Sequence, residues 1–103
     1  MKIIWSVFAK AELQNIFDYY KENASVRVAA NLVEDIVKES HSLITAQYIG
    51  QVESNLSGRK ETYRYLVYKS YKILYTINEA EQSIQIADVF DTRQNPIKIN
   101  RKK

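Results

Sequence analysis

Hydrophobic residues in the first half of the chain form one short run and two stretches with the spacing of a helix. The run Lys2–Trp5 is β-branched and aromatic, which predicts a strand that begins with the chain. Ser6 and Ser25 each offer a side-chain oxygen to the free amides at the start of a following helix. The apolar stripes of the two helices are Ala9, Leu13, Ile16, Phe17 and Tyr20, then Ala29, Leu32, Val33, Ile36, Val37, Leu43 and Ile44. The link at residues 23–25 is so short that the helices are expected to run antiparallel.

The second half of the chain has the two-residue period of strands. Residues 46–62 hold both glycines and show no sustained period, so we expect an irregular connection there. Tight turns are expected at residues 69–70 and 79–82, and Pro96 ends regular pairing because it has no amide hydrogen to donate. Between these breaks three strands are predicted, at residues 63–68, 71–77 and 83–90.

These elements together predict a two-layer α+β fold. An N-terminal strand and three antiparallel strands make a four-stranded sheet, and the helical hairpin covers one of its faces. The chain has 103 residues, which is the size of a single domain, so we expect one domain over residues 1–103.

Composition excludes several classes of protein. The chain has no cysteine, which rules out disulfides and thiolate metal sites. Because 46% of its residues are hydrophobic, the chain can form a core and is not disordered. Its longest apolar runs are far shorter than the roughly 20 residues of a membrane span, so we expect a cytoplasmic protein without membrane contact.

Positive charge is concentrated in the second half. Residues 1–58 carry a net charge of −2 and residues 59–103 a net charge of +5, within the overall +3. Such an asymmetry indicates an anionic partner, either nucleic acid or an acidic protein surface.

The usual catalytic motifs are absent. The sequence has no phosphate-binding loop, dinucleotide fingerprint or nucleophile elbow. His41 is the one histidine and is expected at the surface, and a metal site would need further ligands at suitable spacing. We therefore expect neither a metal nor a cofactor.

Tyrosines and cations gather on or beside the predicted sheet. The tyrosines are Tyr63, Tyr65, Tyr68, Tyr71 and Tyr75. Most of them are expected to pack in the sheet, so the better functional candidates are Arg64, Lys72 and Arg93, whose charges cannot be buried without a partner. RNA cleavage through the 2′-hydroxyl needs a base, an acid and a cation. These side chains permit that chemistry without requiring it, and Asp91 is expected to serve as an ion-pair or turn residue beside Arg93.

The order of these segments resembles the RelE/ParE family of toxins from type II toxin–antitoxin modules, also called plasmid stabilisation proteins. The resemblance covers nearly the full chain. Its segments are Ile4-Trp5-Ser6, Ala9, Ala11-Glu12-Leu13, Tyr19-Tyr20, Tyr63-Arg64-Tyr65-Leu66-Val67, Tyr71-Lys72-Ile73-Leu74-Tyr75 and Asp88-Val89-Phe90-Asp91-Thr92-Arg93-Gln94-Asn95-Pro96.

The resemblance implies a helical hairpin on a curved, mostly antiparallel sheet, and a growth-inhibiting toxin. It also implies a cognate antitoxin, and binding of operator DNA only as the toxin–antitoxin complex. Family toxins divide by target. RelE-like members cut mRNA in the ribosomal A site with Arg, Lys and a Tyr or His, whereas ParE-like members poison DNA gyrase and lack that set.

Three residues match family positions that bear on this choice. Arg64 matches the recurrent Arg of the first meander strand, Tyr75 the Tyr that closes the second, and Arg93 the Arg after the last strand. Together with Lys72 they are the catalytic candidates if the chain is RelE-like. Residues 90–91 are Phe and Asp, where many ribosome-dependent relatives have a His or Tyr. This departure and the long paired helices lean slightly toward ParE-like gyrase inhibition, with mRNA cleavage as the alternative.

Overall fold

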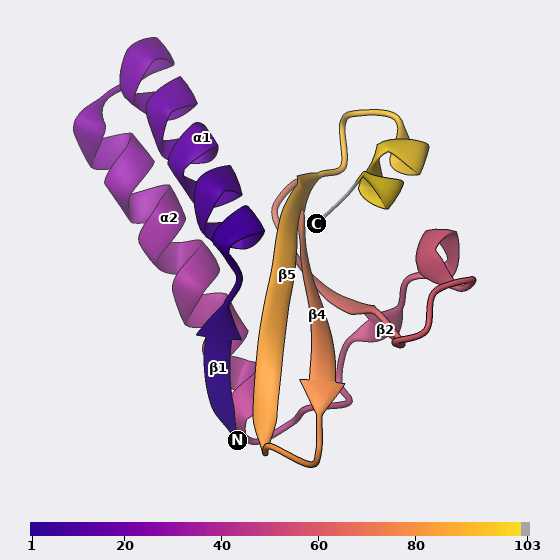
Figure 1. Ribbon diagram of the computed structural model, residues 1–103. Coiled ribbons are helices and arrows are strands. Elements are labelled where there is room, and N and C mark those ends of the chain that lie inside the picture. Colours follow the sequence, from indigo (N-terminus) through magenta and orange to yellow (C-terminus); the bar gives the residue numbers. More distant parts are fainter. Residues whose placement is uncertain (102–103) are drawn as a thin grey trace.

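A computed structural model, which describes residues 1–101, places two helices against one face of a five-stranded sheet (Figure 1). The strands are β1 (Lys2–Trp5), β2 (Gln51–Val52), β3 (Arg64–Tyr68), β4 (Tyr71–Asn78) and β5 (Ser83–Asp91). Their order across the sheet is β1-β5-β4-β3-β2, with β1 parallel to β5 and the other pairs antiparallel. The α+β class and the mostly antiparallel sheet are confirmed, whereas the predicted number of four strands was too low.

The additional strand is β2, which lies inside the stretch predicted to be irregular. It is two residues long and pairs with Arg64 and Tyr65 of β3 at the edge of the sheet. A strand this short cannot show a two-residue period, so its pairing with β3 defines it. The same stretch holds a short 3₁₀ helix, η2 (Ser54–Leu56).

The helices α1 (Val7–Asn23) and α2 (Val26–Ser40) form the expected hairpin. The hydroxyl oxygens of Ser6 and Ser25 each accept the amide hydrogen three residues on, at 3.0 and 3.1 Å. Both predicted N-caps are therefore confirmed. No helix within residues 1–101 is long and apolar enough to cross a membrane.

The second helix ends earlier than its apolar stripe suggested. After Ser40 the chain tightens into a 3₁₀ helix, η1 (His41–Ile44), in which Leu43 is fully buried and His41 is exposed. The stripe thus reaches the core at Leu43 through a change of helix type, whereas Ile44, predicted as its last member, is exposed.

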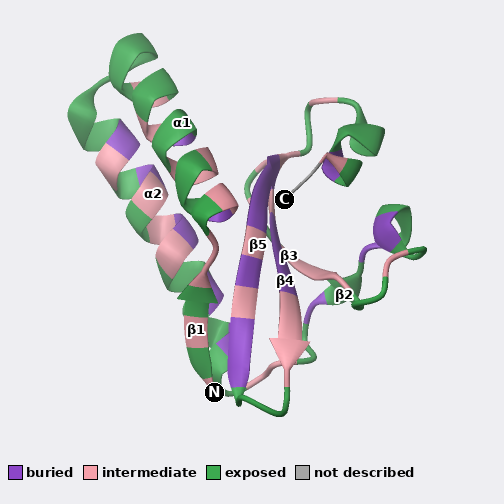
Figure 2. Cartoon of the chain, viewed as in Figure 1, coloured by how far each residue is buried: buried purple, intermediate pink, exposed green. Residues whose placement is uncertain are grey.

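Both faces of the sheet carry a core cluster. The larger cluster lies between the sheet and the helical hairpin, and Figure 2 shows β5 buried along most of its length. Its buried members are Ala9, Ile16, Leu32, Ile36, Leu43, Tyr71, Ile73, Tyr75, Ile84, Ile86 and Val89. The smaller cluster, on the opposite face, joins Leu56 and Ile99 to Leu74 and Phe90. Because Ile99 belongs to the 3₁₀ helix η3 (Pro96–Asn100), the C-terminal segment covers part of that face.

Candidate functional site

Arg64 and Tyr75 are opposite each other in the β3–β4 pair, and both bind the loop that contains Gly50. Tyr75 is fully buried, and its hydroxyl donates to the Gln47 carbonyl at 2.7 Å and accepts from the Gly50 amide at 3.0 Å. The guanidinium of Arg64 donates to the Gly50 carbonyl at 3.0 Å. The two side chains therefore bind both polar groups of Gly50.

The hydroxyl of Tyr75 is committed to this loop. Burial raises the pKa of Tyr75, and this effect outweighs the Gly50 hydrogen bond and the nearby charge of Arg64, which both lower it. A phenol that keeps its proton and donates it to a backbone carbonyl is poorly suited to act as a general base.

A second contact ties the loop to Arg64. The guanidinium carbon of Arg64 lies 5.2 Å from the centre of the Tyr48 ring, a cation–π distance. The Tyr48 hydroxyl in turn donates a hydrogen bond to the Glu79 carboxylate. The loop is thus anchored to the sheet at Gln47, Tyr48 and Gly50.

Lys72 lies on the opposite face of the sheet from Tyr75, because side chains alternate along β4. Its ammonium is 2.6 Å from the Glu53 carboxylate and 4.2 Å from the centre of the Tyr65 ring. Glu53 is buried, which raises its pKa, but the hydrogen bonds from Lys72 and Asn55 outweigh this effect and leave the pKa below the usual range. Lys72 therefore neutralises a buried carboxylate.

Arg93 lies at the far end of β5 and pairs with Asp91. Its Nε and Nη2 atoms donate to the two carboxylate oxygens at 2.9 and 2.8 Å, which is the bidentate geometry of a strong ion pair. The hydrogen bond from Arg93 holds the pKa of Asp91 below its usual range. The Arg93 side chain remains 60% exposed.

Tyr20 and Tyr71 lie beside Arg93, and the sequence did not predict that these two tyrosines are neighbours. A hydrogen bond with Tyr71, and a weaker one with Arg93, lower the pKa of Tyr20, whereas burial raises the pKa of Tyr71. Because Tyr20 is in α1 and Tyr71 begins β4, only the packing of hairpin on sheet makes them neighbours.

The four candidate residues therefore occupy three separate places. Arg64 and Tyr75 share one loop, Lys72 lies on the other face, and Arg93 lies at the end of β5. A site for RNA cleavage needs its base, acid and cation around one phosphate. A catalytic role for these residues stays a prediction, and the structure does not place them around a common point.

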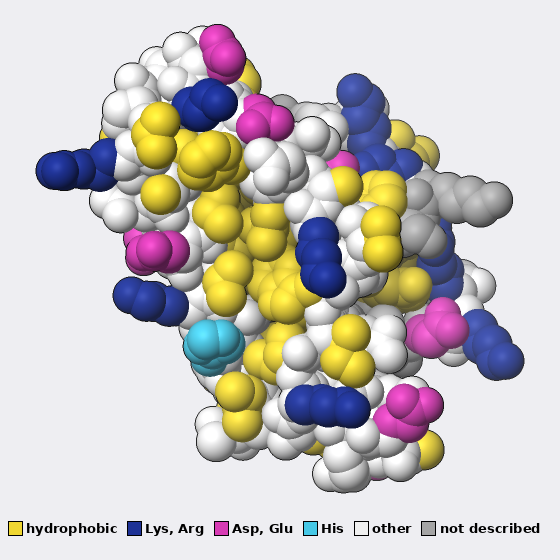
Figure 3. Space-filling model, turned by 60° about the vertical axis from the view of Figure 1, so that its left-hand side comes forward, with side chains coloured by type: hydrophobic (Ala, Val, Ile, Leu, Met, Phe, Trp, Pro, Cys, Tyr) yellow, Lys and Arg dark blue, Asp and Glu magenta, His cyan; other side chains and the backbone are white. Residues whose placement is uncertain are grey.

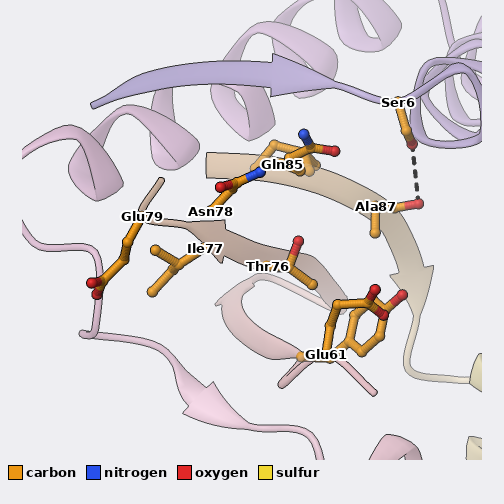
Figure 4. Close-up of a pocket in the computed structure, with 10 residues that line it drawn as sticks. Ser6, Glu61, Thr76, Ile77, Asn78, Glu79, Gln85 and Ala87 are labelled. Carbon is orange, nitrogen blue, oxygen red and sulfur yellow. Dashed lines mark hydrogen bonds between the residues drawn. The ribbon is translucent and has the colours of Figure 1, made fainter. Parts of the chain in front are cut away.

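Both faces of the sheet carry hollows. On the helix side, hydrophobic side chains gather in a band with Lys and Arg side chains beside it (Figure 3). A cleft of about 260 Å³ lies there, and its lining includes Tyr20, Leu32, Lys69 and Tyr71. On the opposite face lies a more polar groove of about 430 Å³ (Figure 4). Its lining includes Glu61, Thr76, Asn78, Gln85 and Ser6, whose hydroxyl donates to the Ala87 carbonyl at 3.3 Å.

Comparison with known proteins decides the family. A family model described as the ParE toxin of type II toxin-antitoxin system, parDE, matches residues 3–96. The chain belongs to the ParE toxin family. The resemblance to RelE/ParE toxins is therefore confirmed, and membership of a toxin–antitoxin family implies a cognate antitoxin as partner of this ParE-family chain.

A solved structure supports the fold of this ParE-family chain. The structure, described as a chromosomal ParDE TA system from P. aeruginosa, has a TM-score of 0.72 and 22% sequence identity. The match covers 88% of this chain and 95% of that one. No curated protein gives a match.

Proposed function

We propose that this ParE-family chain arrests growth, when free of its antitoxin, by binding DNA gyrase rather than by cutting RNA. The observation that carries the proposal is the dispersal of the four candidate residues over two faces and one end of the sheet. Tyr75 is bound to loop backbone, Lys72 to Glu53 and Arg93 to Asp91. Inhibition by surface binding requires no convergent acid, base and cation, so this dispersal is compatible with it.

The second candidate is a RelE-like, ribosome-dependent mRNA endonuclease. It is favoured by Arg93, which is exposed and lies beside Tyr20, whose lowered pKa suits a general base. Against it, the guanidinium of Arg93 already gives two hydrogen bonds to the carboxylate of Asp91. The Asp91 carboxylate therefore neutralises the positive charge of Arg93 that would bind an RNA phosphate.

The antitoxin is proposed to cover the hydrophobic band on the helix side. An amphipathic segment can bury its apolar face in a groove between elements, and acidic residues on it would pair with the cations beside the band, such as Lys69. Operator DNA is proposed to bind only the complex. Co-expression with the neighbouring small gene product should give a stable complex, and failure to do so would contradict this proposal.

The decisive experiment combines two measurements. Purified chain, with and without antitoxin, is titrated into a gyrase supercoiling and cleavage assay, and new RNA 5′ ends are mapped in cells after brief induction. Gyrase inhibition that antitoxin relieves, without new cuts in codon register, is expected. New cuts in codon register with gyrase unaffected would overturn the proposal in favour of the endonuclease.

A further inference from the structure

The segment at residues 44–52, called the loop from here on, runs from the end of η1 through strand β2. It exposes large hydrophobic side chains and carries no charge. In a chain with 26% charged residues, these nine positions include none. Four large hydrophobic side chains among them are exposed, with Ile49 at 63% and Tyr48 at 55%: Ile44, Tyr48, Ile49 and Val52. Single exposed hydrophobics are ordinary, but four within nine consecutive positions make this segment a candidate interaction surface.

This loop is also fixed in place. The Gly50 amide donates to the Tyr75 hydroxyl, the Gly50 carbonyl accepts from Arg64, and the Ile49 amide donates to the Ala46 carbonyl at 3.2 Å. The peptide of Gly50 packs so closely that a Cβ there would lie 2.5 Å from the Tyr75 hydroxyl. A surface that is already ordered loses little conformational entropy when a partner binds.

We propose that the loop at residues 44–52 is the contact by which this chain holds its protein target, and that Arg64 and Tyr75 are positioning residues for it. The inference rests on the proposed function, in which the chain acts by binding a protein. Arg64 and Tyr75 would then contribute to toxicity by holding the loop in place and not by catalysis.

The chemistry of the loop defines the partner as a folded protein with an apolar recess. A nucleic acid would find no counter-charge within the loop, and the nearest guanidinium, that of Arg64, is stacked on Tyr48. Tyrosine is among the residues that contribute most to protein–protein affinity when a pocket buries it. Tyr48, held between Arg64 and Glu79, is therefore the expected anchor, with Ile49 beside it in the chain.

The test compares Ile49→Ser with Val67→Ser. Val67 is a matched control because it is 59% exposed but lies in β3, outside the loop. Each protein is assayed for growth arrest, gyrase inhibition and antitoxin affinity. Ile49→Ser should lose about tenfold in growth arrest and gyrase inhibition, because it removes a large apolar side chain next to the Tyr48 anchor, whereas Val67→Ser should stay within about twofold of the parent.

The positioning role is tested by Tyr75→Phe, which keeps the ring and removes the hydroxyl. The inhibitory potency should fall about tenfold, and hydrogen exchange of the Gly50 amide should accelerate while the amides of β4 and β5 keep their protection. A merely structural role would leave potency unchanged once the fold and antitoxin binding are shown to be intact. That result would overturn the positioning role.

The outcomes separate this inference from the proposed function. Ile49→Ser that arrests growth as strongly as the parent overturns the loop proposal, even if its antitoxin affinity falls. A parent protein that arrests growth without affecting gyrase overturns gyrase as the target. In that case selective loss of growth arrest in Ile49→Ser still supports the loop as the contact with another protein.

Discussion

The guanidinium of Arg101 reaches the carboxylate of Asp88, with 2.9 Å between Nη2 and Oδ1, although Asp88 has no exposed surface. The same guanidinium lies over the rings of Phe8 and Phe90, at 5.1 and 5.3 Å, and 3.5 Å from the Glu12 carboxylate. One side chain after η3 therefore connects β5 to α1. This arrangement makes the segment from η3 to Arg101 part of the fold.

Replacing Arg101 with Ala should destabilise the protein strongly. Removing one partner of a buried ion pair costs about 3 kcal/mol, because the other charge stays buried. The measurement is urea unfolding. Lys98→Ala is the control, since Lys98 is an exposed cation in the same segment and should change stability by less than about 0.5 kcal/mol. Equal unfolding midpoints for the two variants would contradict the role given to Arg101.

The two glycines should respond oppositely to alanine. At Gly50 a Cβ would lie 2.5 Å from the Tyr75 hydroxyl and 2.8 Å from the Tyr65 carbonyl oxygen, so the loop must shift at a cost of about 1–3 kcal/mol. At Gly58 a Cβ would meet nothing within 4 Å, so Gly58→Ala should be neutral or slightly stabilising. Thermal unfolding compares them, and a tolerated Gly50→Ala would show that the close approach is absent in solution.

The Glu53–Lys72 pair should make stability depend on pH in the acid range. The pKa of Glu53 is below its usual value in the folded chain. The stability that ionised Glu53 contributes is therefore fully present above the pKa of glutamate in the unfolded chain, about 4.3. It is lost as pH falls through the lower folded pKa. Glu53→Gln should therefore lose less stability than the parent between about pH 5 and pH 3. Denaturant midpoints at several pH values measure this, and parallel curves would argue against the depressed pKa.

Much of this fold follows from local pattern, and the exceptions have physical causes. The N-caps at Ser6 and Ser25 were predictable because capping depends on neighbouring residues. The strand β2 was missed because only its partner defines it. The burial of Glu53 could not be predicted either, because the charge that neutralises its carboxylate comes from Lys72 of β4, 19 positions along the chain.

The candidate site shows the same division. The residue types were readily found in the sequence, and so was the pair formed by Asp91 and Arg93, two positions apart. The opposite faces of Tyr75 and Lys72 follow from the alternation of side chains along one strand, whereas the place of Arg64 opposite Tyr75 depends on strand register, which the sequence did not resolve. The role of Gly50 depends on a close approach of backbone to the Tyr75 ring, which no local pattern indicates.

Tyr20 and Tyr71, which line the same cleft on the helix side, should each affect the titration of the other. The hydrogen bond with Tyr71 is the largest cause of the lowered pKa of Tyr20, so Tyr71→Phe should raise the pKa of Tyr20. Carbon NMR of labelled tyrosine rings in an alkaline titration resolves the individual residues. Tyr68→Phe is the control, because the Tyr68 hydroxyl bonds to Asp35 instead. An unchanged Tyr20 titration in Tyr71→Phe would exclude the hydrogen bond as the cause.

Arg93→Gln distinguishes the two proposed activities most directly. Arg93 lies outside the loop at residues 44–52, and its partner Asp91 is only partly buried, so the variant should fold. If the chain acts through that loop, growth arrest should remain within about twofold of the parent, as for most surface changes. If Arg93 stabilises the charge of a phosphorane, cleavage should fall by about 100-fold or more, as when a transition-state donor is removed.

Induction of the parent and of Arg93→Gln in cells without antitoxin measures the difference in growth arrest, and thermal unfolding is the control for folding. Loss of growth arrest in a folded Arg93→Gln variant would favour the endonuclease over the binding mechanism. Arg93 is paired with Asp91 and lies outside the loop at residues 44–52, so it should contribute little to a contact made by that loop.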